Sequence, residues 1–104
     1  MPVKVLDDKK TLLEAGKEGN AVFALFSATW CPACQMFEPV FLEVGSKKDF
    51  PMFKVDVEQH EELAGAAGVQ GIPNLVVFKE GKVVDRLVGF VSPEDLEKFL
   101  AKHS

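Results

Sequence analysis

The fold of this chain is decided by the stretch Trp30-Cys31-Pro32-Ala33-Cys34, which holds both cysteines and the only tryptophan. Residues i and i+3 of a helix lie on one face. At the start of a helix, the Cα atoms of Cys31 and Cys34 would lie within the roughly 4.4–6.8 Å that a disulfide tolerates. Pro32 suits the first helical turn, where its missing N–H costs no hydrogen bond. The stretch therefore predicts a redox-active cysteine pair at a helix N-terminus.

The two sulfurs of this pair are not equivalent. If the helix begins near Cys31, that sulfur lies at the positive end of the helix dipole, which favours the nucleophilic thiolate over the thiol. Cys34 lies one turn deeper, and we expect it to be the more buried of the two. The spacing thus predicts Cys31 as the attacking cysteine and Cys34 as the resolving one.

The segments on either side of the motif predict a strand and a helix. Residues 21–27 form a continuous apolar run of strand length, which favours a strand covered on both faces at the centre of an α/β sheet. The motif would then lie at the carboxyl end of a buried strand, where sites form in open α/β sheets. The helix that follows is expected to reach about residue 44. Its predicted apolar face consists of Met36, Phe37, Val40, Phe41 and Val44.

The rest of the chain alternates between short strands and helices. A helix capped by Asp7 or Asp8 should run to residue 15, with Leu12 and Leu13 facing inward. Gly89 is expected to be a bulge or a point of close backbone approach. The other predicted elements are strands at 3–5, 52–57, 74–79 and 82–88, a hairpin turn at 80–81, and helices at 59–67 and from Ser92 onward, with Leu96, Phe99 and Leu100 inward. The predicted order is β-α-β-α-β-α-β-β-α, within a single domain over 1–104.

Composition narrows the range of functions. The chain has 104 residues, 47% of them hydrophobic, which is enough for one core. The net charge of −4 argues against nucleic acid or an anionic membrane as a partner. No long apolar run and no secretory signal is present. Two cysteines three residues apart do not form a disulfide framework, and in a cytosolic context they indicate redox activity. The expected location is the cytoplasm; an exported form that has lost its signal stays open.

The two cysteines also allow interpretations without catalysis. They could form a structural disulfide or be inert buried thiols. A zinc or iron–sulfur site needs about four ligands, and neither His60 nor His103 has ligand-like spacing to the pair. Metal bridging of two subunits is the least favoured alternative. We therefore expect no metal and no cofactor other than the Cys31–Cys34 disulfide itself.

Further motifs accompany the cysteine pair in a fixed order. They are Ala28-Thr29-Trp30-Cys31, Pro39 in the following helix, Lys54-Val55-Asp56, Gly71-Ile72-Pro73, Phe78-Lys79 with Gly81, and Val88-Gly89. In these segments, over essentially the whole chain, the sequence resembles the thioredoxin family. The resemblance implies a three-layer α/β/α sandwich, with a central mixed sheet of about five strands and four helices.

The resemblance also implies a reaction and a substrate groove. Members of the family exchange their active-site dithiol with disulfides of proteins, through a mixed disulfide. Pro73 is expected to be a cis proline beside the cysteines, where the backbone of Ile72 can pair with an extended substrate strand. The apolar groove implied around it consists of Trp30, Gly71, Ile72, Pro73, Gly89 and Phe90. The implied partners are disulfide-containing proteins and a thioredoxin reductase as electron donor, and we expect a monomer.

Two departures from the family bear on mechanism. Thioredoxins usually carry a buried aspartate, a proton acceptor for the resolving cysteine, at the position of Leu25. Lys54 matches the family's buried lysine but has lost that partner, and pairing with Asp56, pairing with Glu58 and contact with solvent are all left open. We expect Leu25 to slow deprotonation of Cys34, so that Leu25→Asp should speed turnover near neutral pH.

The second departure lies between the cysteines, where Pro32-Ala33 replaces the family's usual Gly-Pro. This dipeptide tunes thiol pKa and potential in the superfamily, so we expect a couple more oxidising than that of an ordinary thioredoxin. A disulfide oxidant or isomerase and a glutathione-linked protein are the enzyme alternatives. The alternative from another class is a binding module that holds a partner strand at Ile72–Pro73 without turnover.

Overall fold

The computed structural model describes residues 3–17 and 19–103. Their elements are, in order, β1 (Lys4–Val5), α1 (Lys9–Ala15), β2 (Ala21–Ser27), α2 (Pro32–Gly45), β3 (Met52–Asp56), α3 (Glu61–Ala66), β4 (Asn74–Lys79), β5 (Lys82–Val88) and α4 (Pro93–Ala101). The predicted order of strands and helices is confirmed. The predicted bounds of β2, β4 and β5 agree with the observed ones, and those of the other elements differ by at most two residues, which is the usual uncertainty at helix and strand ends.

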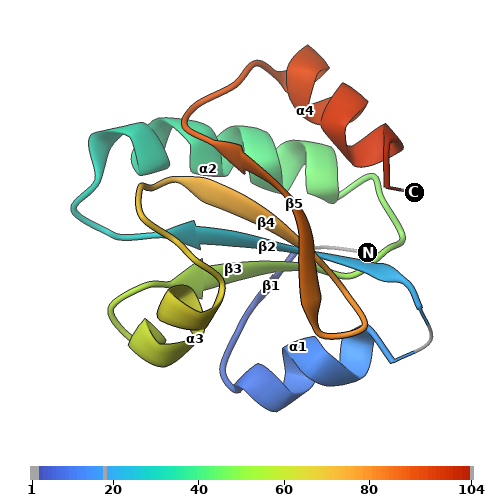
Figure 1. Ribbon diagram of the computed structural model, residues 1–104. Helices are drawn as coiled ribbons and strands as arrows, with labels where there is room; N and C mark the ends of the chain where they lie inside the picture. Colours follow the sequence, from blue (N-terminus) through green and yellow to red (C-terminus); the bar gives the residue numbers. More distant parts are fainter. Residues whose placement is uncertain (1–2, 18, 104) are drawn as a thin grey trace.

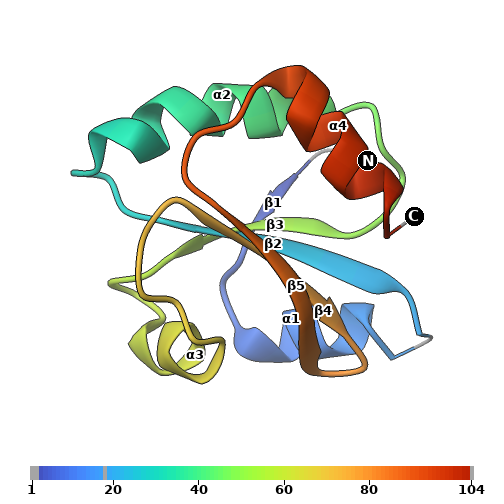
Figure 2. The ribbon, with the colours of Figure 1, turned by 45° about the horizontal axis from the view of Figure 1, so that its top comes forward.

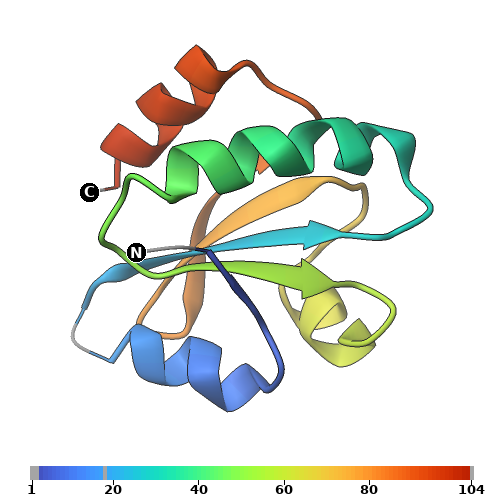
Figure 3. The same cartoon turned by 180° about the vertical axis from the view of Figure 1, so that it is seen from behind.

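The strands of the described chain form one mixed five-stranded sheet in the order β1-β3-β2-β4-β5. β2 is parallel to β3 and antiparallel to β4, and β1 and β5 form the two edges. Helices α2 and α4 cover one face of the sheet, and α1 and α3 cover the other (Figures 1 and 2). The view from behind shows the same three layers (Figure 3). The predicted three-layer sandwich is confirmed.

Strand β2 lies at the centre of the sheet because every one of its residues is apolar or small. All seven residues are buried. Their side chains alternate between two cores, as the two-residue period of a strand requires. Phe23 and Leu25 pack in the core beneath α2 and α4, whereas Val22 and Phe26 pack in the core against α1 and α3. The prediction of a central strand covered on both faces is confirmed.

Helix α1 is capped as predicted but presents a narrower apolar face. The side chain of Asp8 accepts a hydrogen bond of 3.0 Å from the backbone N–H of Lys10, which satisfies one of the free donors at the helix start. Leu12 is 3% exposed, but Leu13 is 49% exposed. The expectation that Leu13 faces inward is wrong, because neighbouring residues of a helix point in directions about 100° apart and this short helix contacts the sheet along one side.

The buried face of helix α2 is also narrower than the predicted apolar face. Phe37, Phe41 and Val44 are buried in the core, and Val40 packs against them. Met36, which was expected on the same face, is 62% exposed. That prediction is wrong, since only the face of α2 toward the sheet and α4 is covered.

The β4–β5 hairpin turns at the predicted dipeptide. Both turn residues have positive φ, +52° at Glu80 and +80° at Gly81. This is the left-handed backbone that two-residue hairpin turns favour, because its twist matches that of the strands. Glycine adopts it without the steric penalty that a Cβ brings.

The bulge of this hairpin is not at Gly89. The register shifts between Val77 and Phe78, which leaves Val84 as the extra residue on β5. Gly89 instead follows β5 with a φ of +91°. Its N–H donates a hydrogen bond of 2.8 Å to the carbonyl oxygen of Pro73. The bulge alternative for Gly89 is therefore wrong. Of the other alternative, a close backbone approach, the structure shows this hydrogen bond to Pro73, whereas a Cβ on Gly89 would meet no atom within 4 Å.

Helix α4 begins and packs as the sequence predicts. The hydroxyl of Ser92 accepts a hydrogen bond of 3.1 Å from the backbone N–H of Asp95. Leu96, Phe99 and Leu100 are buried in the core that α4 shares with α2 and the sheet. Helices α2 and α4 thus share one core, on the face of the sheet opposite to α1 and α3.

Candidate active site

The cysteine motif lies where β2 passes into α2 (Figure 1). Cys31 is the N-cap of α2, with extended backbone angles, and Pro32 is in the first turn. The sulfur of Cys31 accepts a hydrogen bond of 3.2 Å from the backbone N–H of Cys34. That N–H is one of the donors that a helix start leaves without a partner. Negative charge on Cys31 would therefore be stabilised by the hydrogen bond and by the helix dipole together.

The two cysteines differ in burial in the predicted direction. Both are free thiols. Cys31 is 6% exposed and Cys34 is fully buried, at 0%. The small exposed fraction of the pair thus belongs to Cys31, so a partner disulfide would meet that sulfur first.

The environment of Cys34 favours its protonated form. Burial raises the pKa of the Cys34 thiol to about 12, with further upward contributions from its hydrogen bond to Cys31 and from the charges of Cys31 and Glu38. The backbone at Ala28 opposes this rise in pKa. Because only a thiolate attacks a disulfide efficiently, Cys34 needs to lose its proton when it reacts.

A loop far along the chain packs against Cys31. The peptide bond between Ile72 and Pro73 is cis, as the family resemblance implied. The carbonyl oxygen of Ile72 lies 3.9 Å from the Cys31 sulfur. Pro73 is buried, and the half-buried Ile72 packs against the small apolar cluster that contains both cysteines. Residues 41 positions apart in sequence thus form one site.

Exposed apolar side chains surround this site. Trp30 is 64% exposed and Phe90 is 47% exposed. The Phe90 ring lies edge-on to Phe37 of α2, with centroids 6.0 Å apart. The hydrogen bond between Gly89 and Pro73 joins the loop after β5 to the cis-proline loop. The structure thus places residues of the predicted groove on three neighbouring loops.

One exposed apolar residue beside Gly71 was missing from the predicted groove. Val88 is 55% exposed, and its side chain lies 3.9 Å from the position that a Cβ on Gly71 would take. Met36 is also exposed, in the first part of α2. The signal for Val88 was its position directly before Gly89. The apolar spacing of α2 concealed Met36, because that spacing alone does not fix how wide the buried face is.

Comparisons with known proteins agree with this geometry. The family model described as thioredoxin matches residues 3–102. The chain belongs to the thioredoxin family. It is similar to an H-type thioredoxin of Brassica campestris, 37% identical over 95% of this chain and 81% of the relative. It is also similar to the thioredoxin of Bacillus subtilis (strain 168), 40% identical over 81% of this chain and 83% of the relative.

Solved structures show the same similarity. The crystal structure of the reduced thioredoxin pre-protein of Schistosoma mansoni superposes with a TM-score of 0.86 and 31% identity, covering 100% of both chains. Thioredoxins are protein-disulfide oxidoreductases. The chain is therefore a dithiol–disulfide oxidoreductase of this family, with its CxxC pair at residues 31–34.

The site of this thioredoxin contains a carboxylate that sequence analysis missed. Leu25 is fully buried and pairs across the sheet with Lys54 of β3. Lys54 forms an ion pair with Glu38 of α2. The ion pair is thus with neither Asp56 nor Glu58, and the carboxylate of Asp56 instead accepts a hydrogen bond from the backbone N–H of Glu58. The third alternative, contact with solvent, is borne out in part, because the Lys54 side chain is 36% exposed. The available signal was the spacing of Glu38, four residues after Cys34 on the same helix.

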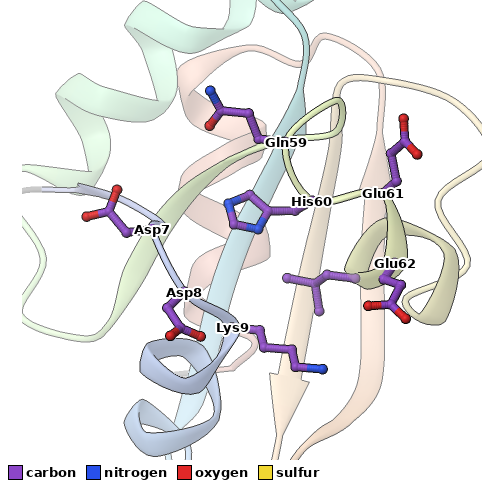
Figure 4. Close-up of a pocket in the computed structure, with 8 residues that line it drawn as sticks. Asp7, Asp8, Lys9, Gln59, His60, Glu61 and Glu62 are labelled. Atoms are coloured by element: carbon purple, nitrogen blue, oxygen red, sulfur yellow. The ribbon is translucent and has the colours of Figure 1, made fainter.

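The histidines lie away from the cysteines. His60 Nε2 is 3.0 Å from the carbonyl oxygen of Leu6, and His103 Nε2 is 2.9 Å from Asp85 Oδ2. A surface pocket beside His60 is lined by residues at the starts of α1 and α3 and contains neither cysteine (Figure 4). Within the described residues, no three metal-binding side chains are grouped as a site. In the same residues, no helix is long and apolar enough to cross a membrane.

Proposed function

We propose that this thioredoxin reduces disulfides of proteins, with Cys31 as the nucleophile and Cys34 as the resolving cysteine. The observation that carries the proposal is the contrast between the two sulfurs. Cys31 caps α2 and is 6% exposed, whereas Cys34 is fully buried. The Cys31 thiolate attacks one sulfur of the substrate disulfide, and the other sulfur leaves as a thiolate. Cys34 then attacks Cys31 and releases the second substrate thiol, which leaves the Cys31–Cys34 disulfide.

The substrate would bind as an extended strand along the backbone of Ile72. Trp30, Gly71, Pro73, Gly89 and Phe90 would supply the apolar walls of the groove. The exposure of Trp30 and Phe90 supports this proposal, because large apolar side chains at the surface beside a reactive thiol are ready to contact a partner. Ala33 lies between the two cysteines and would tune the reduction potential of the pair.

The proposed redox group is the Cys31–Cys34 pair alone, with no cofactor. A thioredoxin reductase would return electrons to the pair after each turnover. We place the protein in the cytoplasm, acting as a monomer on protein disulfides rather than on nucleic acid or membranes. Its net charge of −4 supports this choice of partners.

The simplest test separates the roles of the two cysteines. Cys34→Ser should trap a mixed disulfide with a disulfide-containing protein, visible as a larger species on a non-reducing gel. Cys31→Ser should trap none. Trapping by Cys31→Ser alone would overturn the assignment of roles. The variant with both cysteines replaced by serine should lose all turnover, and continued partner binding by it would favour the binding-module alternative.

We further propose a couple more oxidising than that of thioredoxins with Gly-Pro between the cysteines. Pro32 in the first turn of α2 supports this, because a fixed helix start keeps the Cys34 N–H directed at the Cys31 sulfur. A better stabilised Cys31 thiolate stabilises the reduced form and so raises the potential. Pro32 is also what favours the alternative functions of disulfide oxidant, isomerase or glutathione-linked protein.

The potential can be measured against glutathione buffers by the fluorescence of Trp30, the only tryptophan, which adjoins Cys31. The matched control is the double variant Pro32→Gly with Ala33→Pro. A potential clearly above that of the control is expected. A potential equal to or below the control would refute the proposal, and the general reductase function would then stand without it.

A further inference from the structure

The resolving step requires Cys34 to lose a proton inside the protein. Its sulfur is fully buried, so bulk water does not reach it directly. Burial and neighbouring charges hold its pKa far above neutrality. A group close to Cys34 that can accept a proton and pass it to solvent would remove this obstacle.

Glu38 is in position to do this. Cys34 and Glu38 are residues i and i+4 of α2, so their side chains lie on the same helix face, with Cβ atoms about 5–6 Å apart. The Glu38 side chain is 19% exposed. It therefore has one side toward the buried thiol and a path to solvent on the other. One water molecule can bridge the remaining gap between a carboxylate and a thiol in such a geometry.

Lys54 fixes where this carboxylate points. The lysine lies on β3 directly beside Leu25 of β2, on the sheet face that α2 covers. Its ammonium forms an ion pair with the carboxylate of Glu38. The lysine is thus anchored in the sheet beneath the helix and draws the glutamate side chain toward it.

No other carboxylate of the described residues around Cys34 is in an equivalent position. Strand β2 presents the uncharged Leu25 and Ser27 on this face. On β3, Asp56 shares the face with Lys54, but one of its carboxylate oxygens accepts the N–H of Glu58. Among the charges that raise the pKa of Cys34, the one carboxylate is that of Glu38.

We propose that Glu38 accepts the proton of Cys34 in the resolving step and that Lys54 is a positioning residue that holds the Glu38 carboxylate in place. The proposal rests on the roles of Cys31 and Cys34 given under Proposed function. It moves the proton acceptor from the central strand, where this chain has Leu25, to the helix that carries the cysteines.

The resolving step begins with the substrate bound to Cys31 through a mixed disulfide. The Cys34 sulfur forms a bond to the Cys31 sulfur while its proton passes to the Glu38 carboxylate. The bond between the Cys31 sulfur and the substrate sulfur breaks, and the substrate leaves as a thiolate that takes up a proton from water. Cys34 is thereby oxidised and the substrate sulfur is reduced, while Cys31 passes from the mixed disulfide to the Cys31–Cys34 disulfide. The protonated Glu38 then releases its proton to solvent.

The charge of Glu38 and its capacity to accept a proton act in opposite directions on the rate. As a negative charge, Glu38 disfavours the Cys34 thiolate, so Glu38→Gln should speed resolution if charge were its whole effect. As a proton acceptor it assists the reaction, so Glu38→Gln should slow resolution. The sign of the change therefore distinguishes the two roles without any assumption about its size.

The experiment uses the reduced protein and a symmetric aromatic disulfide whose thiolate is coloured. Rapid mixing should show two phases of colour release, the first from attack by Cys31 and the second from resolution by Cys34. In Glu38→Gln near neutral pH, the first phase should be unchanged. The second should be slower by roughly a hundredfold, the lower end of what a positioned general base contributes.

The pH profile provides a second readout. In Glu38→Gln the rate of the second phase should rise in proportion to hydroxide concentration, because hydroxide is then left as the acceptor. In the unchanged protein it should depend on pH more weakly. A second phase that is unchanged or faster in Glu38→Gln would overturn the proposal. Release of only one equivalent of coloured thiolate per unchanged protein would instead overturn the resolving role of Cys34.

Control variants separate the proposed role from a general effect on α2. Glu43→Gln removes an exposed carboxylate from the same helix and should leave both phases unchanged. Lys54→Met should slow the second phase, by less than Glu38→Gln because the carboxylate is still present. Lys54→Arg should restore most of the rate, since it keeps the ion pair. A normal second phase in Lys54→Met would overturn the positioning role.

Discussion

Moving the carboxylate back to the central strand is the sharpest prediction from this structure. The change is Leu25→Asp in a protein that already carries Glu38→Gln. Leu25 is fully buried beside Lys54, so a carboxylate there would face the same lysine from the sheet instead of from α2. We expect the second phase of colour release to regain most of the rate that Glu38→Gln loses.

The cost in stability can be worked from the burial of Leu25. Removing a fully buried leucine side chain costs about 2–5 kcal/mol, and the new carboxylate is compensated in part by Lys54. A domain of this size has about 5–15 kcal/mol of stability in total, so the variant should fold. Its melting temperature should fall by roughly 10–30 °C, which circular dichroism measures.

The matched control is Leu25→Asn in the same Glu38→Gln protein. It removes the same leucine contacts and introduces a polar group of nearly the same shape, but it supplies no proton acceptor. It should show a similar fall in melting temperature without any recovery of rate. Equal rates in the Leu25→Asp and Leu25→Asn proteins, both folded, would refute the reasoning. In the protein that keeps Glu38, Leu25→Asp should speed resolution only slightly.

Three further predictions concern the rest of the molecule. The pKa of Asp85 is lowered from 3.8, first by its hydrogen bond to His103, so its stabilising effect is present above that value and is lost as pH falls through the lower folded pKa. Asp85→Asn should therefore lower the free energy of unfolding in urea at neutral pH but change it little in strong acid; an equal effect at both would contradict this. Gly89→Ala should cost about 1–2 kcal/mol in the same assay, because φ is +91° there; a neutral result would show that the loop relaxes. Cys31→Ser should lower the pKa of Cys34, because Cys31 contributes to raising it; an unchanged thiolate absorbance titration would argue against that contribution.

Much of the site could be predicted from the sequence because the cysteine motif consists of residues that are neighbours in the chain. The relation of Cys31 to Cys34 follows from helix geometry, and Pro32 marks the first turn. The cap of α4 at Ser92 was recognisable for the same reason. Such features depend on backbone angles and hydrogen bonds within a few residues, which the residue types themselves determine.

The predictions that the structure contradicts depend on contacts between segments distant in the chain. Leu13 and Met36 were placed inside because apolar residues at helical spacing indicate a buried face, but spacing does not determine the width of that face. A bulge was one of two alternatives expected at Gly89, and the bulge lies instead at Val84, because the register of two strands depends on both of them. The partner of Lys54 was sought among residues next to it in sequence, whereas Glu38 lies on another element.

The residue pattern alone predicts the family, the order of elements, the central strand and the two cysteines with their unequal positions on a helix. Which groups surround Cys34 depends on the folded arrangement of the chain. The pairing of Glu38 with Lys54 depends on how α2 lies across the sheet, and the contact of Ile72 with Cys31 joins residues 41 positions apart. Local sequence sets backbone conformation through short-range sterics and hydrogen bonds. The neighbours of a buried thiol are set by the packing of segments distant in the chain, and that packing is a property of the whole core.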